Sequence, residues 1–503
     1  MKTKRTALLG ILLAASLFLQ SCGIIVLNNR SEEETSAPAE TTVPGTTAPP
    51  NTTAPTPETK VVHTDRSEEY QAYADAYLAR IRDSGFAFEG ESFFISSPRT
   101  DLLMPADTEN THSAAIYKRN QAVEDALNIR IAVSATDETA YFDLLNTSIL
   151  ADEYFSDLLL IPEYQIGTFA AGNVLLNLRS APLLDLNQPY FFADSLEAAT
   201  GGSRIFAAAG SASFEETTLS AVFFNRDLFR ENGVDIPFDL VYEGKWTWDA
   251  FFASCAEAEG INKYASANGL GSFSSYSTQY AAELLPAMVF ASCGGRMVRS
   301  EVNASPVIGI SDTDSAIFDV ISRLHREPYA HRETESGVSR FHTGRSLYML
   351  DRLYLMSWMP NSTQNWGILP LPKLTESQES YITLAAPETL FFAMQKNTVD
   401  SAKASVVMSA LNAASYGVLS EAYTHYAMNH LLRDNDSANM LAIISASCSF
   451  DFALAFSGTT VSLAEATTTG LMELARGLSA TSLLARASAA NKRLASRFPA
   501  SDS

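Results

Sequence analysis

The early part of the folded sequence alternates between strand-like and helix-like spacing of its hydrophobic residues. In chain order the segments are apolar 93–95, helical 113–128, alternating 129–133, helical 139–150 and fully apolar 158–161. Strands that alternate with helices and are apolar on both faces are typical of a parallel sheet covered by helices on both sides. The pattern therefore predicts an α/β fold.

Ligands of such sheets bind beyond the carboxyl ends of the strands. In this chain those ends lead into the loops 96–98 and 162–164. Ser97 and Tyr164 are therefore candidate ligand-binding residues.

A helix is predicted to begin at Ser67, with two glutamates in its first turn. Tyrosines and one isoleucine follow at helical spacing, at Tyr70, Tyr73, Tyr77 and Ile81. Such a stripe could stack on sugars, but a helix face packed on the body explains it better.

A second α/β region is predicted from about residue 218. Residues 219–224 are strand-like and end at Asn225. Thr247 is the expected N-cap of a helix, and Trp246 is expected to pack on Phe251 as a hydrophobic staple. Trp366 begins another strand-like segment and is expected in the core.

Two aromatic residues follow the strand-like run 346–350. Tyr354 and Trp358 come shortly after Asp351 and Arg352. Sugar sites combine flat rings with polar side chains that bind hydroxyl groups. The segment therefore predicts a sugar platform that includes Asp351, Tyr354 and Trp358. The alternative is that the two rings, four residues apart, share a helix face and pack inward.

The amino terminus has the pattern of an export signal. Three basic residues precede an apolar run over 8–19, which is shorter than a membrane-spanning helix. Cys22 follows directly, behind Ser21, and this arrangement resembles the lipobox of bacterial lipoproteins. The resemblance implies a signal peptide over 1–21 and a lipid-modified Cys22. Residues 31–60 are rich in Thr and Pro, so 22–60 is expected to be a linker.

Composition narrows the functional classes. The 503-residue chain is 46% hydrophobic, which is enough to build a core, and its formal net charge of −22 disfavours nucleic-acid binding. Walker, HExxH, GxSxG and complete GxGxxG motifs are missing. The seven scattered histidines indicate no metal site, and no cofactor is predicted. Cys255, Cys293 and Cys448 are expected to be buried thiols, with one disulfide as the alternative.

Five segments together resemble one family, the extracellular solute-binding lipoproteins of ABC importers, family 1, and its clostridial members in particular. The matching segments, in order, are 115–124, 223–229, 242–249, 367–373 and 432–441. The resemblance implies a type II periplasmic-binding-protein-like fold with two α/β lobes and a multi-strand hinge. Lobe 1 is expected to comprise 61–217 with 369–415, and lobe 2 to comprise 218–368 with 416–503. The calcium-type loop of many relatives is replaced here by 259–263.

The resemblance also implies a function. A monomeric, lipid-anchored protein on the outer face of the cytoplasmic membrane, in a Gram-positive cell, would bind a carbohydrate and pass it to ABC permease subunits without catalysis. Tyr354 stands roughly where maltodextrin-binding members have a stacking aromatic, and Asp351 where they have a polar contact. A surface sensor or glycan-holding adhesin is the alternative, followed by a glycan hydrolase.

Overall fold

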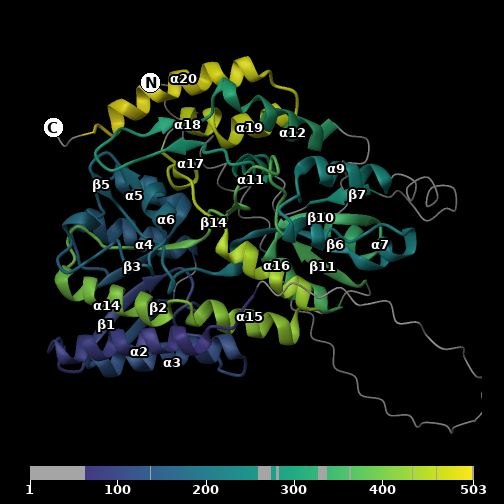
Figure 1. Cartoon of the computed structure of the whole chain (residues 1–503). Coiled ribbons are helices and arrows are strands. Elements are labelled where there is room, and N and C mark those ends of the chain that lie inside the picture. Colours follow the sequence, from purple (N-terminus) through teal and green to yellow (C-terminus); the bar gives the residue numbers. More distant parts are fainter. Residues whose placement is uncertain are drawn as a thin grey trace, which may run out of the picture. The chain divides into compact units, whose positions relative to one another are not determined.

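The computed structural model describes residues 63–135, 138–258, 274–278, 283–326, 337–361, 364–432, 434–459 and 461–500. These residues belong to one compact unit, Thr59–Ser503. The signal segment, Cys22, the Thr/Pro-rich segment and the 259–263 loop lie outside the described residues. The unit is built around two four-stranded sheets (Figure 1).

The first sheet has the strand order β13-β3-β1-β2. Its strands are β1 (Glu91–Ser97), β2 (Ile129–Ala135), β3 (Leu158–Pro162) and β13 (Leu390–Ala393). The pairs β1–β2 and β1–β3 are parallel, as the sequence predicts, whereas β13 runs antiparallel to β3. The predicted helices between the strands are present as α3 (Thr111–Leu127) and α4 (Glu138–Ala151).

Four helices pack together beside the first sheet. The set comprises α2 (Ser67–Asp83), α3, α14 (Ser401–Ser415) and α15 (Val418–His430), at the bottom of Figure 1. Tyr70 and Tyr73 both contact the ring of Tyr416, and Tyr77 contacts Tyr190. The tyrosine stripe therefore faces the body, which confirms the packing interpretation.

The second sheet has the strand order β11-β6-β10-β7. Its strands are β6 (Ser220–Asn225), β7 (Ser274–Ser277), β10 (Ser346–Arg352) and β11 (Trp366–Leu369). β6 runs antiparallel to both β10 and β11, and β10 runs parallel to β7. Trp366 is buried, as expected.

Short helices flank this sheet, and the first and third of them begin at a residue whose side chain caps the helix. They are α7 (Arg226–Asn232), α8 (Phe238–Tyr242) and α9 (Trp248–Glu257). Thr247 caps α9 by accepting a hydrogen bond from the Ala250 N–H, and the Trp246 ring meets Phe251 edge to face at 6.1 Å between centroids. Both local predictions are confirmed.

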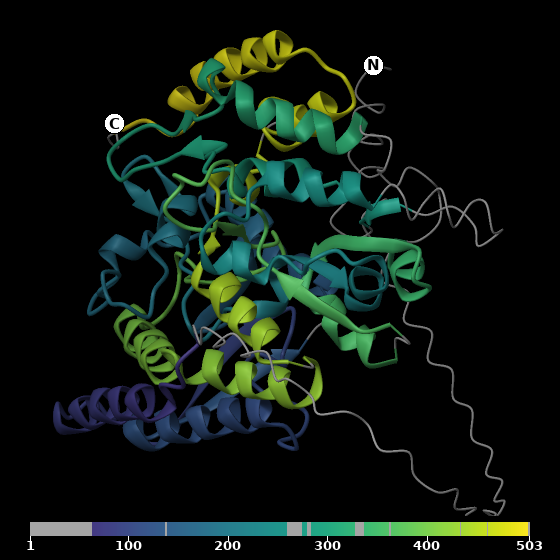
Figure 2. The ribbon, with the colours of Figure 1, turned by 45° about the vertical axis from the view of Figure 1, so that its right-hand side comes forward.

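A layer of five helices combines two from the middle of the chain with three from its last part (Figure 2). The first two are α11 (Leu285–Ser292) and α12 (Ser315–Arg326), and the last three are α18 (Val461–Ala466), α19 (Thr468–Ala475) and α20 (Ala480–Arg497). The remaining helices are α5 (Ile166–Ala171), α6 (Ala193–Ala198), α13 (Gly337–His342), α16 (Asn435–Ala446) and α17 (Phe452–Ala455).

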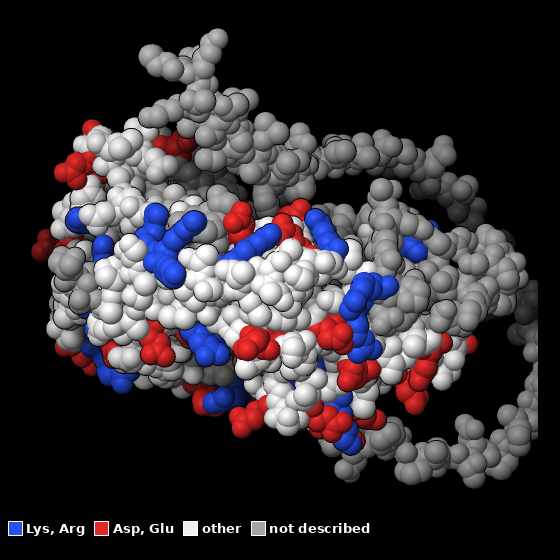
Figure 3. Space-filling view, turned by 90° about the horizontal axis from the view of Figure 1, so that it is seen from above, with Lys and Arg blue, Asp and Glu red and all other residues white. Residues whose placement is uncertain are grey.

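The smaller strands form three two-stranded pairs. They are β4 (Thr200–Gly201) with β5 (Arg204–Ile205), β8 (Val298–Arg299) with β9 (Val307–Ile308), and β12 (Thr383–Leu384) with β14 (Cys448–Ser449). Cys255 and Cys293 are buried, and they and Cys448 are free thiols, so the disulfide alternative is wrong. None of the described helices is both long enough and apolar enough to cross a bilayer. Basic and acidic groups are interspersed on the face seen in Figure 3.

Gly417 provides a test of the helix packing beside the first sheet. Its φ is +69°, and an added Cβ would lie 2.3 Å from the ring of Tyr70. Gly417→Ala should lower the free energy of unfolding for two reasons. Alanine disfavours a positive φ, and the added methyl group overpacks against Tyr70, which costs about 1–3 kcal/mol more. Gly233→Ala is the matched control, because Gly233 has a φ of +63° and open space at the Cβ position. Thermal unfolding should show a larger loss for Gly417→Ala; equal losses would contradict the packing of α2 on α15.

Candidate functional site

Residues 386–389, which we call the crossover turn, lead from β12 into β13 and lie between the two sheets. The Glu163 N–H donates to the Thr389 carbonyl (2.9 Å) and the Tyr164 N–H to the Pro387 carbonyl (3.2 Å). Ala386 donates in turn to the carbonyl of Thr218 (3.1 Å), in η4 (Glu216–Thr218) just before β6. The crossover turn is thus bonded both to the end of β3 and to the start of the second sheet.

The end of β10 reaches the same region. The Leu353 N–H donates to the Leu219 carbonyl (2.8 Å), and Leu219 in turn bridges to Ala385. The 3₁₀ helix η6 (Leu353–Asn361) begins at that point and packs against η4. The platform segment predicted from the sequence therefore lies beside the crossover turn.

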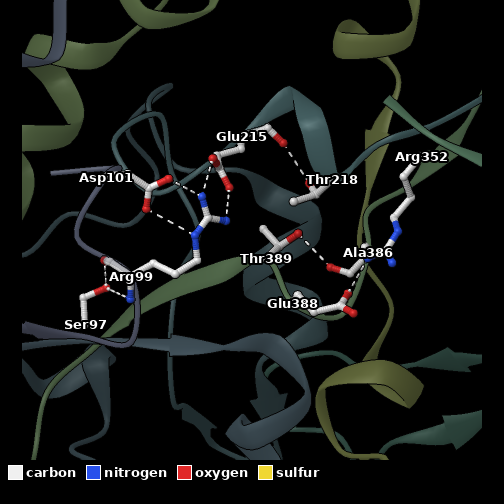
Figure 4. A network of polar contacts seen from close by, with 9 residues as sticks. All are labelled: Ser97, Arg99, Asp101, Glu215, Thr218, Arg352, Ala386, Glu388 and Thr389. Atoms are coloured by element: carbon white, nitrogen blue, oxygen red, sulfur yellow. Dashed lines mark hydrogen bonds and ion pairs between the residues drawn. The ribbon is translucent and has the colours of Figure 1, made fainter. Parts of the chain in front are cut away.

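Arg99 ties the first sheet to the connection that leads into the second. It lies two residues after the end of β1, and its guanidinium donates to both carboxylate oxygens of Glu215, at 2.5 and 2.9 Å, and also to Asp101 (Figure 4). Burial raises the pKa of Glu215, and the charge of Arg99 only partly opposes that rise. Arg99 is therefore the main group that stabilises the Glu215 carboxylate in its charged form.

Arg352 makes a second link, from the end of β10 to the crossover turn. Its Nη1 lies 3.1 Å from the carboxylate of Glu388, whereas its Nε has no hydrogen-bond partner among the described residues. A cavity of about 10 Å³ beside Arg352 is lined mainly by apolar residues. That volume holds about one water molecule and no sugar.

Tyr354 and Trp358 lie on η6 and are both accessible. Their rings meet edge to face, with centroids 5.4 Å apart and an interplanar angle of 68°. The residues are 38% and 42% exposed, respectively. The alternative in which both rings pack into the core is therefore wrong.

The other predicted site residues are less accessible. Ser97 is fully buried at the end of β1, where its hydroxyl contacts the backbone N–H and carbonyl of Arg99. Asp351 is fully buried in β10 and accepts a hydrogen bond from the Arg352 N–H (2.8 Å). Tyr164 is half-buried beside the crossover turn. Ser97 and Asp351 thus stabilise the backbone that positions the two arginines.

Sequence reasoning missed Arg99, Glu215 and Glu388. The available signal for Arg99 was a charged residue two positions beyond a strand end, in the loop where ligands are expected. The two glutamates carry no motif, since only the fold brings them to the arginines.

Three carboxyl groups are buried beneath this region. Glu163 is fully buried, and neither of its carboxylate oxygens has a hydrogen-bond partner of normal geometry among the described residues. Burial, reinforced by the nearby Asp451, raises its pKa well above the ordinary value. Burial also raises the pKa of Asp451 to about 6 and that of Glu216 to about 7.

Several backbone and side-chain donors limit these shifts. Asp451 accepts hydrogen bonds from the N–H groups of Ala453, Met297 and Val298, which favour its charged form. A hydrogen bond with Ser420 does the same for Glu216. Glu163 lacks comparable donors of normal geometry, so burial acts on its carboxyl group with the least opposition and favours the neutral form.

No family model matches the sequence. The curated proteins contain no match either. Solved structures do match, among them the galacto-N-biose/lacto-N-biose I-binding protein of an ABC transporter from Bifidobacterium longum. The TM-score is 0.53 at 12% identity, and the match covers 82% of this chain and 98% of that one.

Two further structures are similar to the same extent. The GacH receptor of Streptomyces glaucescens, solved unliganded and with acarbose, matches with a TM-score of 0.50 at 13% identity over 80% of this chain and 98% of that chain. A family 1 extracellular solute-binding protein from Bifidobacterium longum subsp. infantis matches with a TM-score of 0.50 at 12% identity. That match covers 80% of this chain and 98% of the other. These likenesses establish the fold, and the chain has the predicted type II periplasmic-binding-protein-like architecture.

The buried Glu216 should make stability depend on pH. Its folded pKa of about 7 exceeds the ordinary value of 4.5, so it favours the folded state below about pH 4.5, and that contribution is lost as the pH rises through about 7. This shift in the pKa of Glu216 corresponds to about 3 kcal/mol of the free energy of unfolding. Glu216→Gln cannot ionise, so its melting temperature minus that of the wild type should rise between pH 5 and pH 8.

The exposed Glu231→Gln, on α7, is the control and should run parallel to the wild type at every pH. If the melting temperature of Glu216→Gln also follows that of the wild type at every pH, Glu216 ionises in the folded protein without loss of stability.

Proposed function

We propose that this protein is a membrane-anchored extracellular substrate-binding protein that captures a carbohydrate beside the crossover turn and delivers it to the permease of an ABC importer. The observation that carries the proposal is the pair of accessible rings, Tyr354 and Trp358, directly after Arg352. Flat rings bind the apolar face of a sugar, and the guanidinium offers donors for its hydroxyl oxygens. The fold, shared with binding proteins solved with sugars, supports this class of ligand.

Binding by closure fits the arrangement of the chain. The two sheets are proposed to be the cores of two lobes, with 61–217 and 369–415 in one and 218–368 and 416–503 in the other. The cavity at Arg352 is too small for a sugar, and we instead propose binding at the accessible surface formed by η6 and the loops after β1 and β3. Closure would then bring Tyr164, from the end of β3, toward the rings on η6.

The first test is a thermal-shift screen against mono- and oligosaccharides. A ligand at 100 times its Kd raises the free energy of unfolding by about 2.7 kcal/mol, and small-angle scattering with that ligand should show a smaller radius of gyration. A panel without any stabilising sugar would contradict the proposal. Release of smaller sugars during incubation would indicate a hydrolase instead.

With a sugar identified, the platform can be tested directly. Tyr354→Ala and Trp358→Ala should each weaken binding more than tenfold, or about 1.4 kcal/mol, because each removes a stacking surface. Since both rings are partly exposed, the melting temperature of the unliganded protein should change little. Tyr117→Ala is the matched control, because Tyr117 is 49% exposed on α3. Calorimetric titrations in which all three variants bind like the wild type would place the sugar elsewhere.

The lipid anchor is tested separately. Cys22→Ala removes the thiol that the lipobox-like sequence offers for modification, so the protein should move from the membrane fraction to the medium. Two or three acyl chains would otherwise hold it stably. Retention of the variant in the membrane, with continued labelling by a palmitate analogue, would refute lipidation at this residue.

A further inference from the structure

We propose that His63, Asp65, Glu421 and His425 form a binding site for a divalent transition-metal ion of the zinc class. The first two residues precede α2, and the other two lie on α15. Glu421 and His425 are four residues apart, so their side chains share one face of the helix. This inference is independent of the proposed carbohydrate function.

The side chains of Asp65, Glu421 and His425 converge from distant parts of the sequence, and His63 joins them through its contact with Glu421. His63 Nε2 lies 2.9 Å from Glu421 Oε2, and His425 Nε2 lies 3.1 Å from Asp65 Oδ2. Asp65, Glu421 and His425 each offer one ligand atom, and these three atoms all lie within 4.8 Å of one another. Ligand atoms around a tetrahedral zinc ion are about 3.3 Å apart, given bonds of about 2.0–2.1 Å. Small side-chain movements would therefore let the group enclose an ion.

Hydrogen bonds already orient the two residues that precede α2. The Ser67 N–H and hydroxyl donate to Asp65 Oδ1, at 2.9 and 2.6 Å, and leave Oδ2 directed at His425. The backbone N–H of His63 donates to Asn439 Oδ1 at 3.2 Å. Hydrogen bonds to a ligand residue fix its orientation toward the metal ion, and their loss typically lowers metal affinity by about 10- to 100-fold.

The charges at this site also favour a cation. Two carboxylates face two imidazoles that are neutral when they bind a metal ion. The nearby Arg66 does not compensate, because its guanidinium pairs with Glu69, at 2.7 and 2.5 Å. A mixed set of imidazole and carboxylate ligands suits zinc and its neighbours better than calcium, which prefers six to eight oxygens.

The site is fixed on one side and open on the other. The side chains of His63 and Glu421 are 16% and 10% exposed, whereas those of His425 and Asp65 are 40% and 53% exposed. An ion can therefore enter from solution and meet two side chains that are held in place. Once bound, it would clamp the first described residues of the chain onto α15.

The test uses purified protein stripped with EDTA and titrated with Co²⁺ and then Zn²⁺. One equivalent of Co²⁺ should give visible d–d bands without a thiolate charge-transfer band, and Zn²⁺ should displace it. Zn²⁺ should raise the melting temperature and slow proteolysis near residue 63, and EDTA should reverse both effects.

Variants assign the ligands. His425→Ala and Glu421→Gln should each weaken Co²⁺ binding at least tenfold, and the more exposed Asp65→Asn should do so with little effect on the melting temperature of the metal-free protein. His430→Ala is the matched control, since His430 lies on the same helix outside the group and contacts the ring of Tyr426; it should bind Co²⁺ like the wild type. Absence of stoichiometric Co²⁺ binding by the wild type, or unchanged binding by both Asp65→Asn and His425→Ala, would overturn the proposal.

Discussion

Main-chain hydrogen bonds to the crossover turn are the constraint on which the arrangement of the two sheets depends. Backbone bonds cannot be exchanged by side-chain rotation, so the end of β3 and the start of β6 are both fixed relative to residues 386–389. One arginine–carboxylate contact joins Arg352 to Glu388 in this turn, and the other joins Arg99 to Glu215. These contacts are partly exposed, so they add modest stability and can rearrange at lower cost than the backbone bonds.

Local sequence signals predicted much of the fold. Period-two and period-3.6 patterns located the first three strands and the helices between them, because burial on one or both faces imposes those periods directly. The Thr247 cap and the packing of Trp246 on Phe251 were also predictable, because each involves residues at most five positions apart. The parallel pairing of β1 with β2 and β3 followed from the helical connections between them.

The site was less predictable because its geometry depends on long-range contacts. Arg99 meets Glu215, 116 positions later, and nothing in either local sequence indicates the pairing. Ser97 and Asp351 were expected as ligand contacts in loops beyond the strands, yet each lies within a strand, bonds to the adjoining backbone and is fully buried. The seven histidines were judged to be scattered along the chain, whereas the proposed metal site depends on the spacing between His425 and Glu421, four residues earlier.

The buried carboxyl groups would connect the electrostatics of the site to the proposed closure of the lobes. Glu163 continues directly from β3, and its own N–H is bonded to the crossover turn. A charged carboxylate at this fully buried position would carry a large desolvation cost, so the folded state favours the neutral acid. Any movement of the lobes that admitted water here would lower that cost and allow ionisation. Opening of the region beside Arg352 should therefore become easier as the pH rises, because the open form would bind fewer protons than the closed one.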